Sequence, residues 1–353
     1  MNDVGVHDEK PNIFDLTREE LAFILTERGH KPYRAGQVMN WVYKRYAGSF
    51  QEMTDLPKAL RDDLPNWVEF GSLELLKKQE GAGDQAKRYL WGSGGKPLVE
   101  SVLLKYKYGL TGCLSTQIGC PAGCAFCASR HLGYERGLSK AEIVEEFMRM
   151  CADEKSRIGR LVFMGTGEPF LNYENVMAAI DKLCDPDGYN LSRRRITVST
   201  VGIPEAMREF ARDSRGVRLA LSLHATRDGL RDRLIPLNRT YPIGEVMEAL
   251  GDYARATGQR VTVEYMLISG VNDKKEDARA LVALVEGIDC LVNLIPWNPV
   301  PGLPWERPDA EDVRAFKEVL ERNRVKVTLR RSLGGNIEAA CGQLRREMTE
   351  RNR

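Results

Sequence analysis

The second half of the chain alternates apolar segments with amphipathic helical ones, and this alternation limits the folds open to it. Strands and helices that alternate in this way form parallel strands joined by right-handed crossovers. Six to seven such units suit a barrel, which need not be complete, better than an open sheet. The segments that predict strands are Cys113–Ile118, Arg160–Met164, Ile196–Thr200, Val217–Leu223, Val261–Ile268, Leu291–Ile295 and Val325–Arg330.

Two regions come before this α/β region, which we place at residues 107–353. Residues 1–72 predict a small helical domain, because apolar side chains such as Leu21 and Leu25 recur at helical spacing. Residues 73–106 predict short strands around a glycine-rich turn, and we expect this β extension to bridge the other two regions.

Composition sets limits on partners and compartment. The chain has 353 residues, with 52 Lys plus Arg against 50 Asp plus Glu, so its formal charge of +2 predicts no bulk affinity for polyanions. Local basic patches such as Arg193–Arg195 leave room for a local nucleic-acid face. No apolar run is long enough to span a bilayer, and the start of the chain does not resemble a signal peptide. Eight cysteines, several of them clustered, indicate a reducing, cytoplasmic setting.

Three of these cysteines form the run Cys120-Pro-Ala-Gly-Cys124-Ala-Phe-Cys127, which supplies three thiolates to one metal centre. Structural zinc requires a closed tetrahedron, and iron–sulfur clusters that only transfer electrons generally take four thiolates. A cube held by three cysteines leaves one iron open to another ligand. A zinc knuckle completed by His131 is an alternative, although the spacing matches zinc modules poorly.

Other polar residues follow the later predicted strands. Gly167 and Glu168 follow the second predicted strand, within Gly165-Thr-Gly-Glu-Pro169. Two glycines permit close backbone approach to a ligand, and the carboxylate offers a polar contact. We expect the other candidates to converge with these on one rim of the barrel, since the carboxyl ends of parallel strands share an edge. They are Ser199, Ser222, Leu223, His224 and Asn298.

Taken together, the motifs resemble the RlmN/Cfr family of radical S-adenosylmethionine RNA adenine methyltransferases, and most closely its RlmN-type members. The resemblance covers nearly the whole chain and includes the amino-terminal accessory domain. It rests on Tyr33–Trp41, Met53–Pro57, Cys113-x6-Cys120-x3-Cys124-x2-Cys127, Gly165–Pro169, Ser222-Leu-His224, Ile295-Pro-Trp-Asn-Pro299 and Ala339-Ala-Cys-Gly-Gln-Leu344.

This resemblance implies a partial (βα)6-type radical S-adenosylmethionine barrel. It implies one 4Fe-4S cluster on Cys120, Cys124 and Cys127, whose open iron is chelated by S-adenosylmethionine. The residues that it implies for holding S-adenosylmethionine are the rim residues Gly167, Glu168, Ser199, Ser222, Leu223, His224 and Asn298.

The resemblance also implies a covalent radical mechanism that uses two S-adenosylmethionine molecules per turnover. Cys341 takes a methyl group from the first, and a 5′-deoxyadenosyl radical from the second removes a hydrogen from that methyl group. The carbon radical then adds to carbon 2 of the adenine. Glu100 accepts a proton, and Cys113 resolves the thioether by forming a disulfide with Cys341.

The implied partners are 23S ribosomal RNA near the peptidyl transferase centre and, in addition, transfer RNA. A flavodoxin or ferredoxin system would supply electrons, a thiol reductant would regenerate the cysteines, and the protein would be a monomer. Arg34, Lys44, Arg45 and the Arg193–Arg195 patch are the candidate phosphate contacts.

The sequence departs from the family pattern in two places. Thr166 replaces a methionine, and Gly335-Asn336 replaces a pair of acidic residues before Cys341. Three alternatives therefore stay open: methylation at carbon 8, a non-catalytic RNA-binding protein with a structural cluster, and radical modification of a protein or small molecule.

Overall fold

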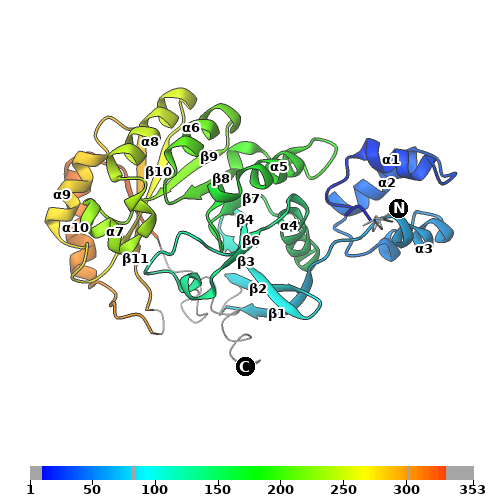
Figure 1. Cartoon of the computed structure of the whole chain (residues 1–353), viewed down its shortest axis with the longest axis horizontal. Coiled ribbons are helices and arrows are strands. Elements are labelled where there is room, and N and C mark those ends of the chain that lie inside the picture. Colours follow the sequence, from blue (N-terminus) through cyan, green and yellow to red (C-terminus); the bar gives the residue numbers. More distant parts are fainter. Residues whose placement is uncertain (1–9, 82–84, 300–301, 331–353) are drawn as a thin grey trace, which may run out of the picture.

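A computed structural model describes residues 10–81, 85–299 and 302–330 of the chain. A curved sheet of ten strands, in the order β1-β2-β3-β4-β7-β8-β9-β10-β11-β12, forms its centre. A second sheet pairs β5 (Gln117–Gly119) with β6 (Tyr134–Gly137). Figure 1 shows the helices of the large region along the outer side of the curved sheet and a small group of helices apart from it, near the amino terminus.

The predicted parallel strands are confirmed as an incomplete barrel, because each neighbouring pair from β4 to β12 is parallel. The strands are β4 (Gly109–Leu114), β7 (Arg160–Phe163), β8 (Ile196–Thr200), β9 (Arg218–Ser222), β10 (Val261–Leu267), β11 (Cys290–Pro296) and β12 (Val327–Leu329).

The first predicted strand, Cys113–Ile118, is wrong as a single element. β4 ends at Leu114, and Gln117 begins β5, which pairs with β6 instead. The backbone N–H groups of Thr116 and Gln117 both donate to the carbonyl of Thr166, at 2.8 and 3.2 Å. These bonds replace the ladder to β7 and direct the chain away from the barrel sheet.

The β extension continues the barrel sheet. It consists of β1 (Glu74–Glu80), β2 (Ala86–Ser93) and β3 (Lys96–Tyr106), which pair antiparallel, and β3 also pairs antiparallel with β4. The predicted strand segments 88–91 and 99–104 lie inside β2 and β3. The extension therefore supplies the edge of the sheet next to β4, while the domain boundaries at residues 72 and 106 stay predictions.

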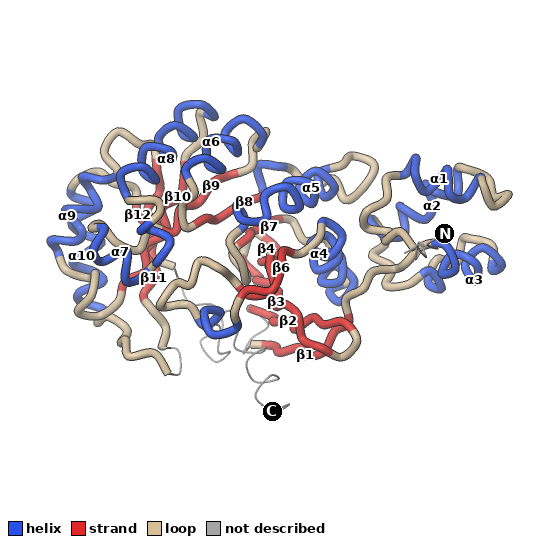
Figure 2. The backbone as a smooth tube through the Cα atoms, in the orientation of Figure 1, coloured by secondary structure: helices blue, strands red, loops and turns tan. Residues whose placement is uncertain are grey.

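Helices cover one face of the parallel sheet, and in β8 and β11 the side chains of the other face are less buried. In β8, Ile196 and Val198 are fully buried in the core, whereas Thr197 and Ser199, at the alternate positions, are only partly buried. The same alternation occurs along β11. Figure 2 shows helices along the outer side of the strands. The covering helices are α4 (Lys140–Glu154), α5 (Tyr173–Cys184), α6 (Pro204–Asp213), α8 (Ile243–Thr257), α9 (Lys275–Leu284) and α10 (Ala310–Arg322).

Short elements complete the described fold. One is an α-helix, α7 (Asp228–Leu234), and five are single turns of 3₁₀-helix. Those turns are η1 (Phe50–Glu52), η3 (Ala128–Leu132), η4 (Pro169–Asn172), η5 (Arg193–Arg195) and η6 (Pro236–Arg239). Within the described ranges, no helix combines the length and the apolar composition that crossing a bilayer requires.

The expected accessory domain consists of α1 (Arg18–Thr26), α2 (Tyr33–Tyr43) and α3 (Lys58–Trp67). A capping box begins α1, in which the Glu20 N–H donates to Thr17 Oγ1 at 3.1 Å. Leu21 and Leu25, which set the helical spacing in the sequence, are both fully buried.

A carboxylate of α4 fixes the point where the accessory domain joins the barrel. Glu145 is fully buried and accepts the backbone N–H groups of Ser72 and Leu73 at 2.8 and 3.0 Å. Arg149 pairs with Glu145 at 3.0 Å and donates to the Phe70 carbonyl at 3.2 Å. Burial raises the pKa of Glu145, and the three contacts to its carboxylate, from Ser72, Leu73 and Arg149, offset part of the cost of that burial. Gly71, at the centre of this joint, has a φ of +78°.

We predict that Gly71→Ala destabilises the protein by about 1–3 kcal/mol more than Gly29→Ala does. The two glycines have the same φ of +78°, but a Cβ at Gly71 would lie 2.1 Å from Glu145 Oε1, whereas a Cβ at Gly29 meets nothing within 4 Å. Gly29→Ala therefore measures the backbone strain alone. Urea unfolding of both variants checks this, and equal losses would contradict the role given to Glu145.

Candidate active site

The cysteine loop, residues 120–127, lies at the carboxyl edge of the barrel strands. It directly follows β5, and the Ala125 N–H donates to the Leu234 carbonyl at the end of α7, at 2.8 Å. Ala122 and Cys124 are buried in an apolar cluster with Leu234 and Trp297. The loop is thus fixed to the barrel on two sides.

The three thiols of the loop fit an iron–sulfur cluster by donor chemistry, because soft thiolates select such clusters. Cys124 is buried, while Cys120 and Cys127 are partly buried. Burial and the negative charges of Cys127 and Glu168 contribute to raising the pKa of Cys120 to about 12, so the three thiols and Glu168 are electrostatic neighbours. In the described part of the chain, no three His, Cys, Asp or Glu side chains already form a closed metal site.

Glu168 joins the end of β7 to the end of β8. Its carboxylate accepts the N–H of Phe170 at 3.0 Å and that of Val201 at 2.8 Å. Burial raises its pKa to about 6. Before it, Gly167 has a φ of +116°, and a Cβ there would lie 2.5 Å from Thr116 Oγ1. The backbone conformation and the close packing both require glycine at this position.

The next two strands bring the predicted serines together. Ser199 Oγ of β8 lies 3.3 Å from Ser222 Oγ of β9. Leu223 follows Ser222 and is fully buried, and its N–H donates to the Glu264 carbonyl at 3.1 Å. Asn298 follows β11, is exposed and accepts a hydrogen bond from Arg307. All four residues lie at or just beyond the carboxyl ends of strands, as predicted.

His224 is a neutral histidine in a fixed orientation. Its backbone has a φ of +57°, and its Nδ1 accepts the Met266 N–H at 3.0 Å, which places the ring proton on Nε2. The ring of Phe126, inside the cysteine loop, packs edge-on against it at 5.0 Å. Burial, and to a lesser extent the charge of Arg231, lower its pKa to about 3.

Glu100 and Cys113 lie on one face of the sheet. Cys113 pairs with Val102 in the antiparallel β3–β4 register, so Glu100, two residues from Val102, shares that face and is the diagonal neighbour of Cys113. Arg88 Nε lies 3.5 Å from Glu100 Oε2, with both side chains under 5% exposed. Cys341 lies outside the described residues, so its link to Cys113 stays a prediction.

Sequence reasoning missed two buried charges that hold this site. Arg88 pairs with Glu100, and Arg231 is buried on α7, the helix that packs with the cysteine loop. Arg88 was inside a predicted strand, and Arg231 was inside a helical window with other charged residues. No local pattern distinguishes a buried arginine from a solvated one, because its partners come from distant segments.

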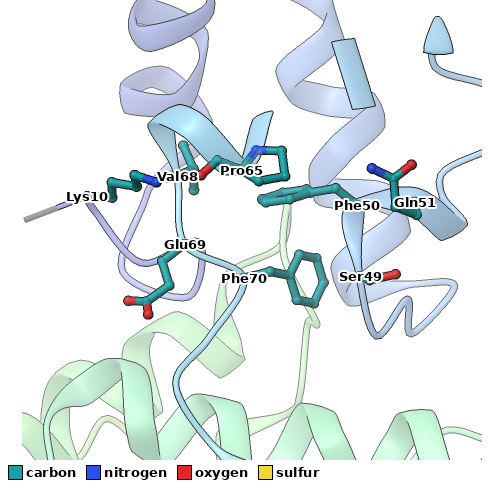
Figure 3. Close-up of a pocket in the computed structure, with 8 residues that line it drawn as sticks. All are labelled: Lys10, Ser49, Phe50, Gln51, Pro65, Val68, Glu69 and Phe70. Carbon is teal, nitrogen blue, oxygen red and sulfur yellow. Dashed lines mark hydrogen bonds between the residues drawn. The ribbon is translucent and has the colours of Figure 1, made fainter. Parts of the chain in front are cut away.

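A separate pocket of about 730 Å³ lies in the accessory domain and is drawn in Figure 3. Phe50 and Phe70 meet edge to face in it at 4.8 Å, and Lys10 donates to the Pro65 carbonyl at 2.9 Å. Its lining contains no cysteine or histidine. We therefore place the chemistry at the barrel rim instead.

Comparison with known proteins agrees with this geometry. Residues 11–69 match the family model "Ribosomal RNA large subunit methyltransferase N-terminal domain", and residues 114–282 match "Radical SAM superfamily". Two relatives named "Probable dual-specificity RNA methyltransferase RlmN" come from Pelotomaculum thermopropionicum (46% identity, 96% of this chain and 93% of the relative) and Thermotoga maritima (43%, 95% and 97%). The crystal structure of a radical SAM methyltransferase from Sphaerobacter thermophilus is 40% identical, with a TM-score of 0.89 over 94% of this chain and 98% of that one.

We predict that His224→Asn makes stability less sensitive to acid. The folded-state pKa of about 3 is below the ordinary 6.5, so between these values the unfolded chain binds a proton that the folded chain does not. The wild type should therefore lose about 1.4 kcal/mol per pH unit through His224 as the pH falls below 6.5. Asparagine tolerates a positive φ, and its side-chain oxygen can accept the Met266 N–H.

Urea unfolding of the metal-free protein between about pH 4 and pH 7 measures this slope. The difference between the two proteins isolates His224 from the carboxylates that titrate in the same range. Parallel stability curves would show that His224 is not held neutral.

Proposed function

Because this chain belongs to the RlmN family of radical S-adenosylmethionine RNA methyltransferases, we propose that it methylates carbon 2 of an adenine in large-subunit ribosomal RNA, and also in transfer RNA. The observations that support the proposal are the three-cysteine loop, which packs with residues from the carboxyl ends of the barrel strands, and the shared sheet face of Glu100 and Cys113. The name "dual-specificity", which the relatives carry, supports two RNA substrates.

Cys120, Cys124 and Cys127 would hold a 4Fe-4S cluster with one iron open to S-adenosylmethionine. When bound and reduced by a flavodoxin or ferredoxin system, the cluster supplies the electron that splits S-adenosylmethionine into methionine and a 5′-deoxyadenosyl radical. Glu168, Ser199 and Ser222 offer polar groups to that molecule from the strand ends.

Carbon 2 of adenine requires covalent catalysis because it is electrophilic and does not attack a sulfonium methyl group. In our proposal the Cys341 thiolate first displaces the methyl group of one S-adenosylmethionine and releases S-adenosylhomocysteine. After hydrogen abstraction, the methylene radical on Cys341 would add to carbon 2, the adduct would return one electron to the oxidised cluster, and Glu100 would accept the carbon 2 proton.

Release then requires a second thiol. Cys113 attacks the Cys341 sulfur, a disulfide forms, the carbon–sulfur bond breaks, and the released carbon takes a proton to become the methyl group. Two electrons from a thiol reductant regenerate the cysteines. The register that puts Cys113 on the same face as Glu100 supports these two roles. The reducing cytoplasm suits this cycle.

Of the two predicted RNA contacts, the structure favours the accessory domain. Arg34 stacks on the exposed ring of Tyr33 at 4.9 Å, and Lys44 is exposed. Arg45 is partly neutralised, since it pairs with Asp55 at 3.4 Å. The Arg193–Arg195 patch immediately precedes β8, so it lies at the amino edge of the sheet, opposite the cysteine loop. A phosphate there would be far from the base that reacts.

We predict that Cys341→Ala abolishes 2-methyladenosine formation, whereas Cys113→Ala leaves the protein covalently attached to RNA. The first variant lacks the methyl acceptor, and the second lacks the thiol that breaks the thioether. Nucleoside mass spectrometry and denaturing gels of the anaerobic reaction check both outcomes, with Cys184→Ala as the control because that thiol lies on α5.

The same experiment separates the alternatives. Appearance of 8-methyladenosine would replace carbon 2 by carbon 8 as the target. RNA binding without 5′-deoxyadenosine formation would favour a non-catalytic protein, and cofactor cleavage that RNA does not affect would favour a protein or small-molecule substrate.

We further predict that Arg34→Glu combined with Lys44→Glu weakens RNA binding and reduces its dependence on salt by about one ion per lost contact. Arg194→Glu changes the charge by the same amount per residue at the opposite edge of the barrel and should leave the affinity near that of the wild type. Filter binding across a salt series measures both. A larger loss from Arg194→Glu would assign RNA contact to the amino edge.

A further inference from the structure

A buried arginine lies on α7, the helix whose Leu230 and Leu234 pack in one cluster with the cysteine loop. Arg231 is on α7 and is only 1% exposed, although the protein has other arginines on its surface. Burying a guanidinium is costly unless its nitrogens find hydrogen-bond acceptors and its charge has a favourable neighbour. Arg231 has both the acceptors and the favourable neighbour. The mechanism proposed above gives this residue no role.

Hydrogen bonds hold the guanidinium across the ends of two strands. Its Nε donates to the Leu223 carbonyl at 3.1 Å, and its Nη2 donates to the carbonyls of Ser222, at 3.3 Å, and of Val201. Its Nη1 donates to Asn238 Oδ1 at 2.9 Å. These acceptors fix the plane of the group at the point where β8 and β9 open onto the rim. None of these bonds ends on a carboxylate, so they do not neutralise the charge.

The positive charge of Arg231 has Cys124 of the cysteine loop as a neighbour. Leu230 and Leu234, on either side of Arg231 in α7, pack in the apolar cluster that contains Cys124. The Cys124 thiol is an electrostatic neighbour of the guanidinium and, among the surrounding charges, the one that favours the charged arginine most. Leu230, Leu234 and Cys124 are all buried, so solvent and salt screen this interaction less than they would at the surface.

The two carboxylates of α7, Asp228 and Asp232, contact Asn238 and make no hydrogen bond to the guanidinium. Asp228 Oδ1 and Asp232 Oδ1 accept from Asn238 Nδ2 at 2.9 and 2.7 Å, so Asn238 lies between them and the guanidinium. They reduce the field of Arg231 without cancelling it by contact. The arginine therefore presents a net positive charge to the loop.

We propose that Arg231 is a positioning residue whose fixed positive charge makes a cluster bound by Cys120, Cys124 and Cys127 easier to reduce. The inference rests on the proposed function only in requiring that cluster. Reduction adds one electron from an external donor to a centre that already carries the charge of three thiolates, so a nearby buried cation stabilises the reduced form more than the oxidised form.

The test compares Arg231→Gln with Arg231→Lys in anaerobically reconstituted full-length protein without RNA. Glutamine keeps a donor group but loses the charge, whereas lysine keeps the charge but loses the planar fork. A redox titration followed by electron paramagnetic resonance gives the reduction potential. We expect Arg231→Gln to lower the reduction equilibrium constant at least tenfold, a shift of about 59 mV for one electron, and Arg231→Lys to stay near the wild type.

Two controls complete the experiment. Arg227→Gln removes an arginine whose side chain is 66% exposed and pairs with Asp277 at 3.2 Å, and it should leave the potential unchanged. Asp232→Asn keeps an acceptor oxygen for Asn238 and removes a negative charge behind the guanidinium, so it should raise the potential. If Arg231→Gln does not fold, the reduction potential of Asp232→Asn still tests the proposal.

The outcomes are distinct from those for the proposed function. Equal potentials in the wild type, Arg231→Gln and Arg231→Lys, or equal shifts in both variants, would overturn the electrostatic role and leave methylation untouched. A fall in potential with Asp232→Asn would overturn it as well. A wild-type protein that binds no iron would instead overturn the proposed function.

Discussion

The whole arrangement depends on the strand register, which turns one set of side chains in each barrel strand toward the covering helices and the alternate set toward the inner face of the sheet. In β10, Tyr265 is fully buried and packs against Phe316 of α10 at 5.3 Å. On the alternate positions, Glu264 accepts from Asn293 of β11 at 2.8 Å. A slip of one residue in register would exchange these two sets, placing carboxylate and amide under the helices. The register therefore fixes both the core and the polar face on which the site lies.

Helix α4 connects the accessory domain to the site. Glu145 holds the joint at Gly71, and the next residue, Glu146, is fully buried and accepts the Ser115 N–H at 3.2 Å. Ser115 Oγ donates to the Glu100 carbonyl at 2.6 Å and accepts the Thr166 N–H at 2.9 Å. One helix thus sets the positions of the proposed proton acceptor and of the glycine loop. Because Thr166 enters this network through its backbone, the network tolerates a change of side chain at that position.

The sequence predicted the helices and strands better than it predicted the contacts between residues that are distant along the chain. Apolar segments that alternate with amphipathic helical segments located the parallel strands, since a strand buried in a parallel sheet is recorded in the sequence as a short apolar run. It missed the break after Leu114, because the cause is a pair of hydrogen bonds to Thr166, about fifty residues further along. It also missed the ion pair of Arg88 with Glu100 and the buried position of Arg231, for the same reason.

By itself, the sequence determined the three thiols proposed to bind the cluster and the family of the protein. Three thiols at fixed spacing on one loop depend only on local chain geometry, and so do the glycines before Glu168. Only the tertiary structure decided which residues share a face or an edge. It placed Glu100 beside Cys113, Arg231 on the helix that packs with the cysteine loop, and Arg193–Arg195 on the far edge. Strand direction and order set those relations, and they arise from pairing between distant segments, which no local pattern encodes.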